Sequence, residues 1–372
     1  MDPVDMSASL NATRTLAPSD AVRCAWVDVA KGLCIVLVVM MHSTLGTGEA
    51  MGGEGFMHHV VAFAKPFRIP DFFLLSGLFL GRVIGRDWRL FADRRVVHFA
   101  YFYVIWVLIQ SVVKAGPIVE GTDGAAGALS AFGLHLAWAL VEPYSTLWFI
   151  YLLAVFSVVT KFLHKRLHPL ALVAGAAVLQ SLPLHGVPYL LEEFCGRYVY
   201  FLIGFVFAER IFDIAQWVRG HVGPALAGLA LWAALNAALA FTNTGFEHYP
   251  TLASLPVVSL VIGSLGAMAI VAVAALLTEA GGSVTRALRA CGERSIVIYL
   301  AFFLPMALTR GVMVRADLDV GLASLIVTAV AVVTPLAFAR LIRGTRLSFL
   351  FHRPAAFHIA DAPKKTLRMQ PA

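Results

Sequence analysis

The chain has 372 residues, of which 59% are hydrophobic and only 14% are charged, and its mean hydropathy is +0.80. A soluble domain does not need that much apolar surface, and the strands of a membrane barrel would show as short alternating segments, so both classes are excluded. The net charge of +7 comes from basic residues that lie between the hydrophobic segments, so we expect no nucleic-acid partner.

The apolar residues come in runs of about 18 to 25, which is the length of a membrane-spanning helix. We therefore expect an all-α polytopic membrane protein with about ten transmembrane helices. A transmembrane domain is expected at 23–345, between a disordered cytoplasmic N-terminus at 1–22 and a cytoplasmic tail at 346–372. The predicted spans are 25–46, 58–81, 96–114, 146–163, 168–184, 196–212, 222–243, 253–278, 292–309 and 318–340.

The charges of the connecting loops predict the orientation of the chain. Three connections, 47–57, 185–195 and 244–252, contain no Lys or Arg, whereas the segments between them are basic. Basic loops stay in the cytoplasm, so both termini are expected there and the protein is expected in a bacterial inner membrane, as a multi-pass protein surrounded by lipid.

The first hydrophobic segment contains three ionisable residues, Asp28, Lys31 and His42, in the stretch DVAKGLCIVLVVMMH. A helix turns about 100° and rises about 1.5 Å per residue, so Lys31 and His42 share a face about 16 Å apart. Ionisable residues inside a span usually mark a functional site. A neutral imidazole can take a proton from a hydroxyl group, which makes His42 a candidate catalytic residue. The structural alternatives are a histidine hydrogen-bonded between helices and an Asp28–Lys31 ion pair at the interface.

The second segment carries Lys65, Arg68 and Asp71 among two prolines, Pro66 and Pro70. Each proline removes a helix donor, so this helix is expected to be kinked or broken near mid-depth. A broken helix with ionisable groups is tolerated where it lines a cavity walled by protein. Arg68 and Asp71 are therefore candidate binding residues, with a purely structural buried pair as the alternative.

An arginine-rich segment follows on the expected cytoplasmic side. Clustered guanidinium groups suit phosphate recognition, and the alternative is a plain positive-inside anchor. Trp148 and Tyr299 are further candidates, for which packing is the alternative. The piece Leu129–Val141 is too short to span and is expected to be re-entrant or interfacial. The candidate binding residues of the arginine-rich segment are Arg82, Arg86, Arg89, Arg94, Arg95 and His98.

Soluble-enzyme signatures are absent from the sequence, including a P-loop, G-x-S-x-G and H-E-x-x-H, and the four cysteines show no metal-site spacing. We expect no metal and no bound cofactor.

The first helix resembles the membrane acyltransferase 3 family, whose signature is an Arg, ten residues and a His. Lys31 takes the Arg place and His42 matches the His. FRIPDFFLLSGLFLGR at 67–82 resembles the second helix of that family, and LWFIYLL (147–153), RYVYFLIGFVFA (197–208) and SIVIYLAF (295–302) resemble later ones. Phe302 stands where many members have a His, and His98 stands where many have the second Arg of R-x-x-R. The closest resemblance is to the stand-alone form of the family without an SGNH domain.

The resemblance implies an enzyme, an O-acyltransferase that moves an acyl group, with acetyl expected, from cytoplasmic acyl-CoA as co-substrate to a hydroxyl of a cell-envelope glycan or lipid. It implies that His42 is the base or acyl carrier and that the Lys31 position matters for function. A transporter or flippase that uses the same polar line is the alternative, and a non-catalytic sensor or scaffold is a third.

Overall fold

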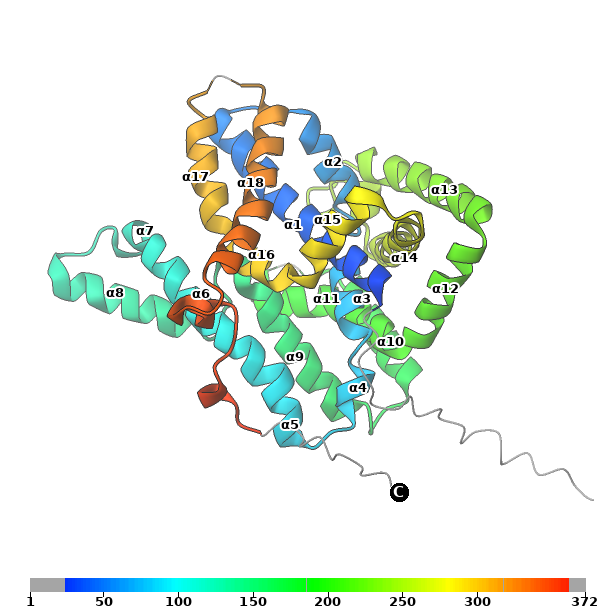
Figure 1. The fold of residues 1–372 in the computed structure, drawn as a ribbon, viewed down its shortest axis with the longest axis horizontal. Coiled ribbons are helices and arrows are strands. Elements are labelled where there is room, and N and C mark those ends of the chain that lie inside the picture. Colours follow the sequence, from blue (N-terminus) through cyan, green and yellow to red (C-terminus); the bar gives the residue numbers. More distant parts are fainter. Residues whose placement is uncertain (1–23, 185, 317, 361–372) are drawn as a thin grey trace, which may run out of the picture.

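The computed structural model describes residues 24–184, 186–316 and 318–360. These residues form helices joined by turns, with an isolated β-bridge between Asn243 and Thr251, so the all-α prediction is confirmed. The predictions for 1–22 and for the tail beyond 360 lie outside the described residues. The helices are α1 Ala25–Met51, α2 Phe56–Ala64, α3 Pro70–Gly77, α4 Gly81–Ile84, α5 Trp88–Ala92, η1 Asp93–Val97, α6 His98–Val113, α7 Ala115–Val119, α8 Gly124–Ala139, η2 Ser145–Leu147, α9 Trp148–Leu163, α10 Pro169–Ser181, α11 Tyr189–Val206, α12 Ala208–Gly220, α13 Val222–Phe241, η3 Leu252–Ser254, α14 Pro256–Ala280, α15 Gly282–Glu293, α16 Ser295–Ala301, α17 Phe303–Met313, α18 Val320–Leu341, η4 Arg346–Leu350 and η5 Ala355–Phe357 (Figure 1).

Six helical stretches among the described residues are long and apolar enough to cross a membrane, and a seventh is added if α16 and α17, bent by 55° at Phe302, form one span. The protein is thus a multi-pass membrane protein, while the expected count of ten stays a prediction. Three other expected spans are not among these stretches, and each has a physical reason. The segment 58–81 is broken, α10 has only 13 residues, and α11 carries Glu192, Glu193 and Arg197. The six stretches are α1, Trp88–Val113, Ser145–Leu163, α13, α14 and α18.

The two ends of the bundle differ in charge. In Figure 1, α4 and α5 lie at the lower end and α2 lies at the upper end, so the arginine-rich segment and the loop 47–57 are on opposite sides. By the positive-inside rule, the lower end is the one expected to be cytoplasmic. Arg310 departs from the pattern, because α17 places its guanidinium against Gly46 near the upper end of α1. Figure 1 shows α7 and α8 projecting beside the bundle, and Leu129, Leu134 and Trp138 of α8 are exposed, which suits an interfacial hairpin.

The break predicted in the second span is present at residues 65–69. α2 ends at Ala64, and α3 begins with Pro70 at its first position, where the missing N–H costs nothing. Two glycines of α14 make room for the break: a Cβ at Gly266 would lie 2.3 Å from the Cβ of Phe67, and one at Gly263 would lie 3.2 Å from the Pro66 carbonyl oxygen. The irregular backbone is therefore enclosed by protein.

Reciprocal glycine contacts hold two pairs of helices, α1–α15 and α3–α11, closely together. In the α1–α15 contact, a Cβ at Gly32 would lie 2.0 Å from the Leu288 carbonyl oxygen, and one at Gly292 would lie 1.7 Å from that of Asp28. In the α3–α11 contact, Gly77 faces the carbonyl of Phe201 in the same way, and Gly204 faces that of Leu74. Small residues let backbones approach this closely and are the usual basis of helix association in membranes.

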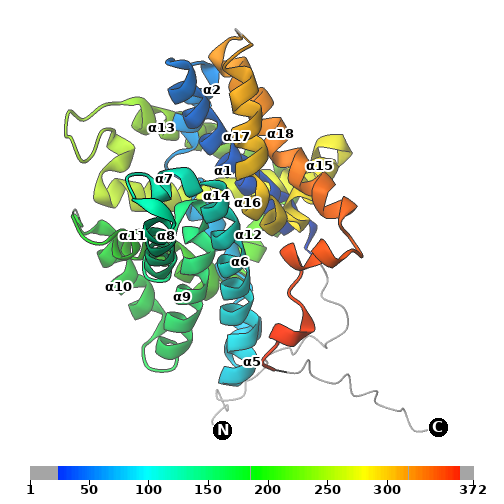
Figure 2. The same cartoon turned by 90° about the vertical axis from the view of Figure 1, so that its left-hand side faces the viewer.

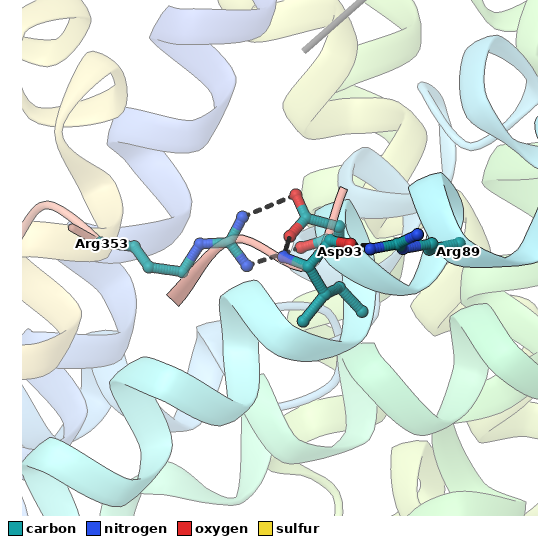
Figure 3. Close-up of polar contacts among 4 residues, drawn as sticks. Arg89, Asp93 and Arg353 are labelled. Atoms are coloured by element: carbon teal, nitrogen blue, oxygen red, sulfur yellow. Dashed lines mark hydrogen bonds and ion pairs between the residues drawn. The ribbon is translucent and has the colours of Figure 1, made fainter. Parts of the chain in front are cut away.

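The segment 346–360 is bound to the arginine-rich start of the Trp88–Val113 stretch through Asp93 (Figure 3). Arg353 donates to the Asp93 carboxylate at 2.7 Å and to its backbone carbonyl at 2.8 Å, and the Ile359 N–H donates to the other carboxylate oxygen at 2.8 Å. Both side chains of the ion pair are buried. Arg89 closes the contact by donating to the Ile359 carbonyl. Residues 346–360 therefore run down α6 as part of the fold (Figure 2).

Gly204→Ala should destabilise the α3–α11 contact, because the added Cβ would lie 2.0 Å from the Leu74 carbonyl oxygen. Overpacking of this kind costs about 1–3 kcal/mol. We expect a clear drop in the thermal unfolding midpoint of the purified protein. The matched control is Gly196→Ala on the same helix, where nothing lies within 4 Å of the added carbon. Equal midpoints for the two variants would contradict the proposed tight contact.

Candidate functional site

His42 lines a cavity of about 270 Å³ that is built from five parts of the chain, which we call the His42 cavity. α1 contributes His42, and the break between α2 and α3 contributes Arg68. α11 contributes Tyr189, Glu193 and Arg197. The lining residues are Val38, Met41, His42, Arg68, Ile69, Phe72, Thr146, Trp148, Phe149, Tyr189, Glu193, Arg197 and Tyr299.

Lys31, three turns earlier on α1, lines a second cavity of about 290 Å³, which we call the Lys31 cavity. Its polar lining comes from Lys31, Arg95 and two serines, and the remainder is apolar. The lining residues are Lys31, Phe72, Leu75, Ser76, Phe79, Arg95, Phe99, Phe149, Ile150, Leu153, Ser295, Ile296 and Tyr299. Lys31 and His42 thus face the same side of α1, as their spacing predicts.

Three aromatic residues, Phe72, Phe149 and Tyr299, line both cavities and form a partition between them. The rings of Phe72 and Phe149 are stacked with their centroids 4.6 Å apart, and Phe149 meets Tyr299 edge-on at 5.7 Å. The Tyr299 hydroxyl donates to the Thr146 carbonyl, which fixes this ring from the side of α9. The two cavities are therefore separated by a layer one side chain thick.

His42 contacts Phe302 at the bend between α16 and α17, with ring centroids 5.5 Å apart. Phe302 is fully buried and is the residue that stands where the resembling family often has a histidine. An apolar ring here gives the imidazole a packing partner without a hydrogen bond. His42 also lines the cavity, together with Arg68 and polar residues of α11.

The Lys31 cavity is positively charged because a π-helical turn directs Arg95 into it. In η1 the three successive residues Asp93, Arg94 and Arg95 diverge: the first is buried against the tail, the second is exposed and the third lines the cavity. π-turns often occur at functional sites. Arg95 donates to the Phe79 carbonyl at 3.4 Å, and the Lys31 ammonium lies 5.4 Å from the Phe79 ring centroid. Phe79 thus holds both cations at one wall.

Trp148 and Tyr299 join His42 and Arg68 in the His42 cavity, whereas other predicted residues lie outside both cavities. Asp28 is buried in the first turn of α1 against α15, and Asp71 is fully buried beside Cys34. Arg82 stacks on Phe79, and Arg89 is bound to the tail. The predicted residues that line neither cavity are Asp28, Asp71, Arg82, Arg86, Arg89, Arg94 and His98.

The sequence reasoning missed the contribution of α11. Glu193 and Arg197 are joined by an ion pair of 3.1 Å and place a carboxylate and a guanidinium in the His42 cavity. Their i, i+4 spacing at the start of a hydrophobic run was a readable signal. Phe72 and Phe149 carried no such signal, because a buried phenylalanine in a membrane helix is ordinary. Among the described residues no cluster of three His, Cys, Asp or Glu has the form of a metal site.

Comparison with known proteins identifies one family. The model of an acyltransferase domain, acyltransferase 3, matches residues 25–341. The chain is also similar to the inner membrane protein YcfT of Escherichia coli strain K12, at 25% identity over 186 residues, which cover 44% of this chain and 49% of the relative. The match thus spans about half the length of this curated relative. No solved structure matches the chain significantly.

Phe149→Ala should join the two cavities, because it removes the ring that contacts both other members of the partition. The readout is a single cysteine at position 76, in the Lys31 cavity, in a chain whose four native cysteines are replaced. A membrane-impermeant thiol reagent added on the expected outer side should label this cysteine faster in Phe149→Ala. Phe102→Ala, which removes a buried ring outside both cavities, is the control. Equal labelling rates in the two variants would contradict the partition.

Proposed function

Because the chain belongs to the family of membrane acyltransferases whose domain covers residues 25–341, we propose that it is an inner-membrane O-acyltransferase that moves an acyl group, with acetyl expected, from cytoplasmic acyl-CoA to a hydroxyl of a cell-envelope glycan or lipid. The observation that carries the proposal is the pair of cavities. One contains the imidazole of His42, the other contains Lys31 and Arg95, and a single aromatic layer separates them.

The Lys31 cavity suits the donor. CoA carries several phosphate charges, and guanidinium and ammonium groups form strong charge-assisted hydrogen bonds with phosphate. Lys31 and Arg95 line this cavity, and Arg82 lies nearby on the face of Phe79 at the arginine-rich end of the bundle. The rest of the lining is apolar, which suits the acyl arm. In this proposal the thioester reaches the aromatic partition from the cytoplasmic side and passes between its side chains to meet the acceptor in the His42 cavity.

The His42 cavity suits the acceptor. In the proposed reaction, the acceptor oxygen attacks the thioester carbonyl carbon while His42 takes the hydroxyl proton. A C–O bond forms, the C–S bond then breaks, and the thiolate leaves with the proton that His42 returns. Arg68 is placed to stabilise the negative charge that develops on the carbonyl oxygen. If His42 instead carries the acyl group, the same bonds are exchanged in two steps.

A transporter or flippase remains the second candidate, and one observation favours it. The bundle contains two interrupted elements, the break at 65–69 and the 55° bend between α16 and α17. Transporters build substrate sites from discontinuous helices near mid-depth. The two functions differ in one measurable quantity, because only the transferase releases free CoA in proportion to acylated acceptor.

His42→Asn should lower acyl transfer by at least about two orders of magnitude, because general-base help is worth about 10²–10⁴ in rate and an amide cannot take the proton. The assay compares acylated glycans and lipids by mass spectrometry after the variant is expressed in a deletion strain. Expression and thermal stability should stay normal, since Asn keeps similar size. His59→Asn, an exposed histidine outside both cavities, is the control. Near-normal turnover in His42→Asn would contradict the catalytic role of His42 and favour the transporter hypothesis.

Lys31→Gln and Arg95→Gln should each weaken acetyl-CoA binding about tenfold or more, since a hydrogen bond to a charged group contributes about 1.5–3 kcal/mol. Titration calorimetry on protein in lipid nanodiscs measures the affinity. Arg219→Gln, an exposed arginine on α12, is the matched control and should bind like the parent. If neither cavity variant loses affinity, the donor does not bind in the Lys31 cavity.

A further inference from the structure

The wall of the His42 cavity carries more positive than negative charge. Arg68 and Arg197 both line it, and Glu193 is the one carboxylate in the lining. Glu193 lies 3.1 Å from Arg197, so this pair is internally balanced. Arg68, which lines the cavity together with His42, is not part of this pair, and the carboxylate that acts on it electrostatically, Asp71, lies outside the cavity lining.

Arg68 is not satisfied by its protein surroundings. Its Nε and Nη1 atoms are buried and have no hydrogen-bond partner among the described residues. Asp71, three residues later, does not provide one, because its carboxyl lies beside Cys34 and lines no part of the cavity. A buried charged donor without a partner is costly, so such groups are normally kept to bind something. Arg68 also sits in the break between α2 and α3, where no regular helix structure requires it.

A more polar cavity adjoins the His42 cavity at the Glu193–Arg197 ion pair. Glu193 and Arg197 also line a neighbouring cavity of about 160 Å³, together with Gln180 and Ser259. The Gln180 side chain donates to the Ser259 hydroxyl at 2.8 Å. Amide, hydroxyl and carboxylate groups in one cavity can form hydrogen bonds with the hydroxyl groups of a sugar, and they do not favour a hydrocarbon chain.

We propose that the acceptor is an acidic glycan whose carboxylate or phosphate binds Arg68, with Arg197 beside it. This assignment rests on the proposed function and narrows it to one substrate class. The planar guanidinium of Arg68 binds such an anion through two parallel N–H bonds. Neighbouring sugar units extend past Glu193 towards Gln180, and a hydroxyl of the bound unit is presented to His42. Arg68 thereby selects and orients the acceptor in addition to its part in charge stabilisation.

The test uses three sugars that differ only at carbon 6: glucose, glucuronate and glucose 6-phosphate. Binding of each to the full-length protein in nanodiscs is measured by titration calorimetry. We expect at least one of the two anions to bind about tenfold or more tightly than glucose, because only they make charge-assisted bonds. Tighter glucuronate identifies a uronic-acid acceptor, and tighter glucose 6-phosphate identifies a phosphorylated one.

The variants assign the preference to Arg68. Arg68→Gln should bind all three sugars equally, and Arg68→Lys, which keeps the charge but loses the planar fork, should retain part of the preference. Arg310→Gln is the matched control, because Arg310 lies near the same end of the bundle but lines neither cavity, and it should behave like the parent. Equal affinity for the three sugars in the parent, or an unchanged preference in Arg68→Gln, would overturn the proposal.

A second readout separates this proposal from the proposed function. Acetyl-CoA binding depends on the Lys31 cavity, which Arg68 does not line, and it is measured on the parent protein by the same titration calorimetry. If the parent binds acetyl-CoA but shows no preference for anionic sugars, the result supports the transferase function and contradicts the acidic acceptor. If the parent prefers anionic sugars but does not bind acetyl-CoA, the result supports the anion site and contradicts the transferase function.

Discussion

An interrupted helix cannot face lipid, because its free backbone groups would find no partner there. The rest of this structure follows from the way in which the bundle encloses the break at 65–69. α14 presents Gly263 and Gly266 to the break, and α11 is drawn against α3 by the reciprocal contacts of Gly77 and Gly204. Enclosure brings α11 and its Glu193–Arg197 pair next to Arg68. The same packing that makes the break tolerable therefore assembles the charged wall of the His42 cavity.

α1 connects this wall to the opposite side of the membrane. It runs unbroken for 27 residues, so Lys31 and His42 are held at a fixed separation on one face. α15 presses on its first turns, where Gly32 and Gly292 allow backbone contact, and holds Lys31 towards Phe79 and Arg95. One rigid helix thus places a cation in one cavity and an imidazole in the other. The aromatic partition between them comes from three other helices, α3, α9 and α16.

The sequence predicted the helical class, the shared face of Lys31 and His42 and the break at Pro66 and Pro70, because each follows from local rules of helix geometry. Arg68, Trp148 and Tyr299 were predicted as candidate binding residues, but the sequence did not predict that they would line the same cavity. The partition was beyond sequence reasoning, since the pairing of Phe72 with Phe149 depends on how α3 meets α9. The arginine-rich segment shows the same limit. A π-turn places Arg95 in the Lys31 cavity and leaves Arg94 exposed, and no sequence pattern predicts this turn. The span count was uncertain for a related reason, because hydrophobicity alone does not distinguish a straight helix from two short ones.

The buried contact between Arg353 and Asp93 bears on how the orientation of such a chain is studied. Reporter enzymes are often fused to the ends of successively shortened chains. The activity of each reporter is then used to infer on which side of the membrane the shortened chain ends. Any fusion that ends before Arg353 removes the guanidinium from a carboxylate that is only 1% exposed, and it also removes the Ile359 N–H. The shortened chain then lacks the ion pair and the hydrogen bond that hold Asp93 at the start of the Trp88–Val113 stretch, in the same turn as Arg95. A reporter inserted into a loop of the intact chain avoids this, because residues 346–360 stay docked along α6.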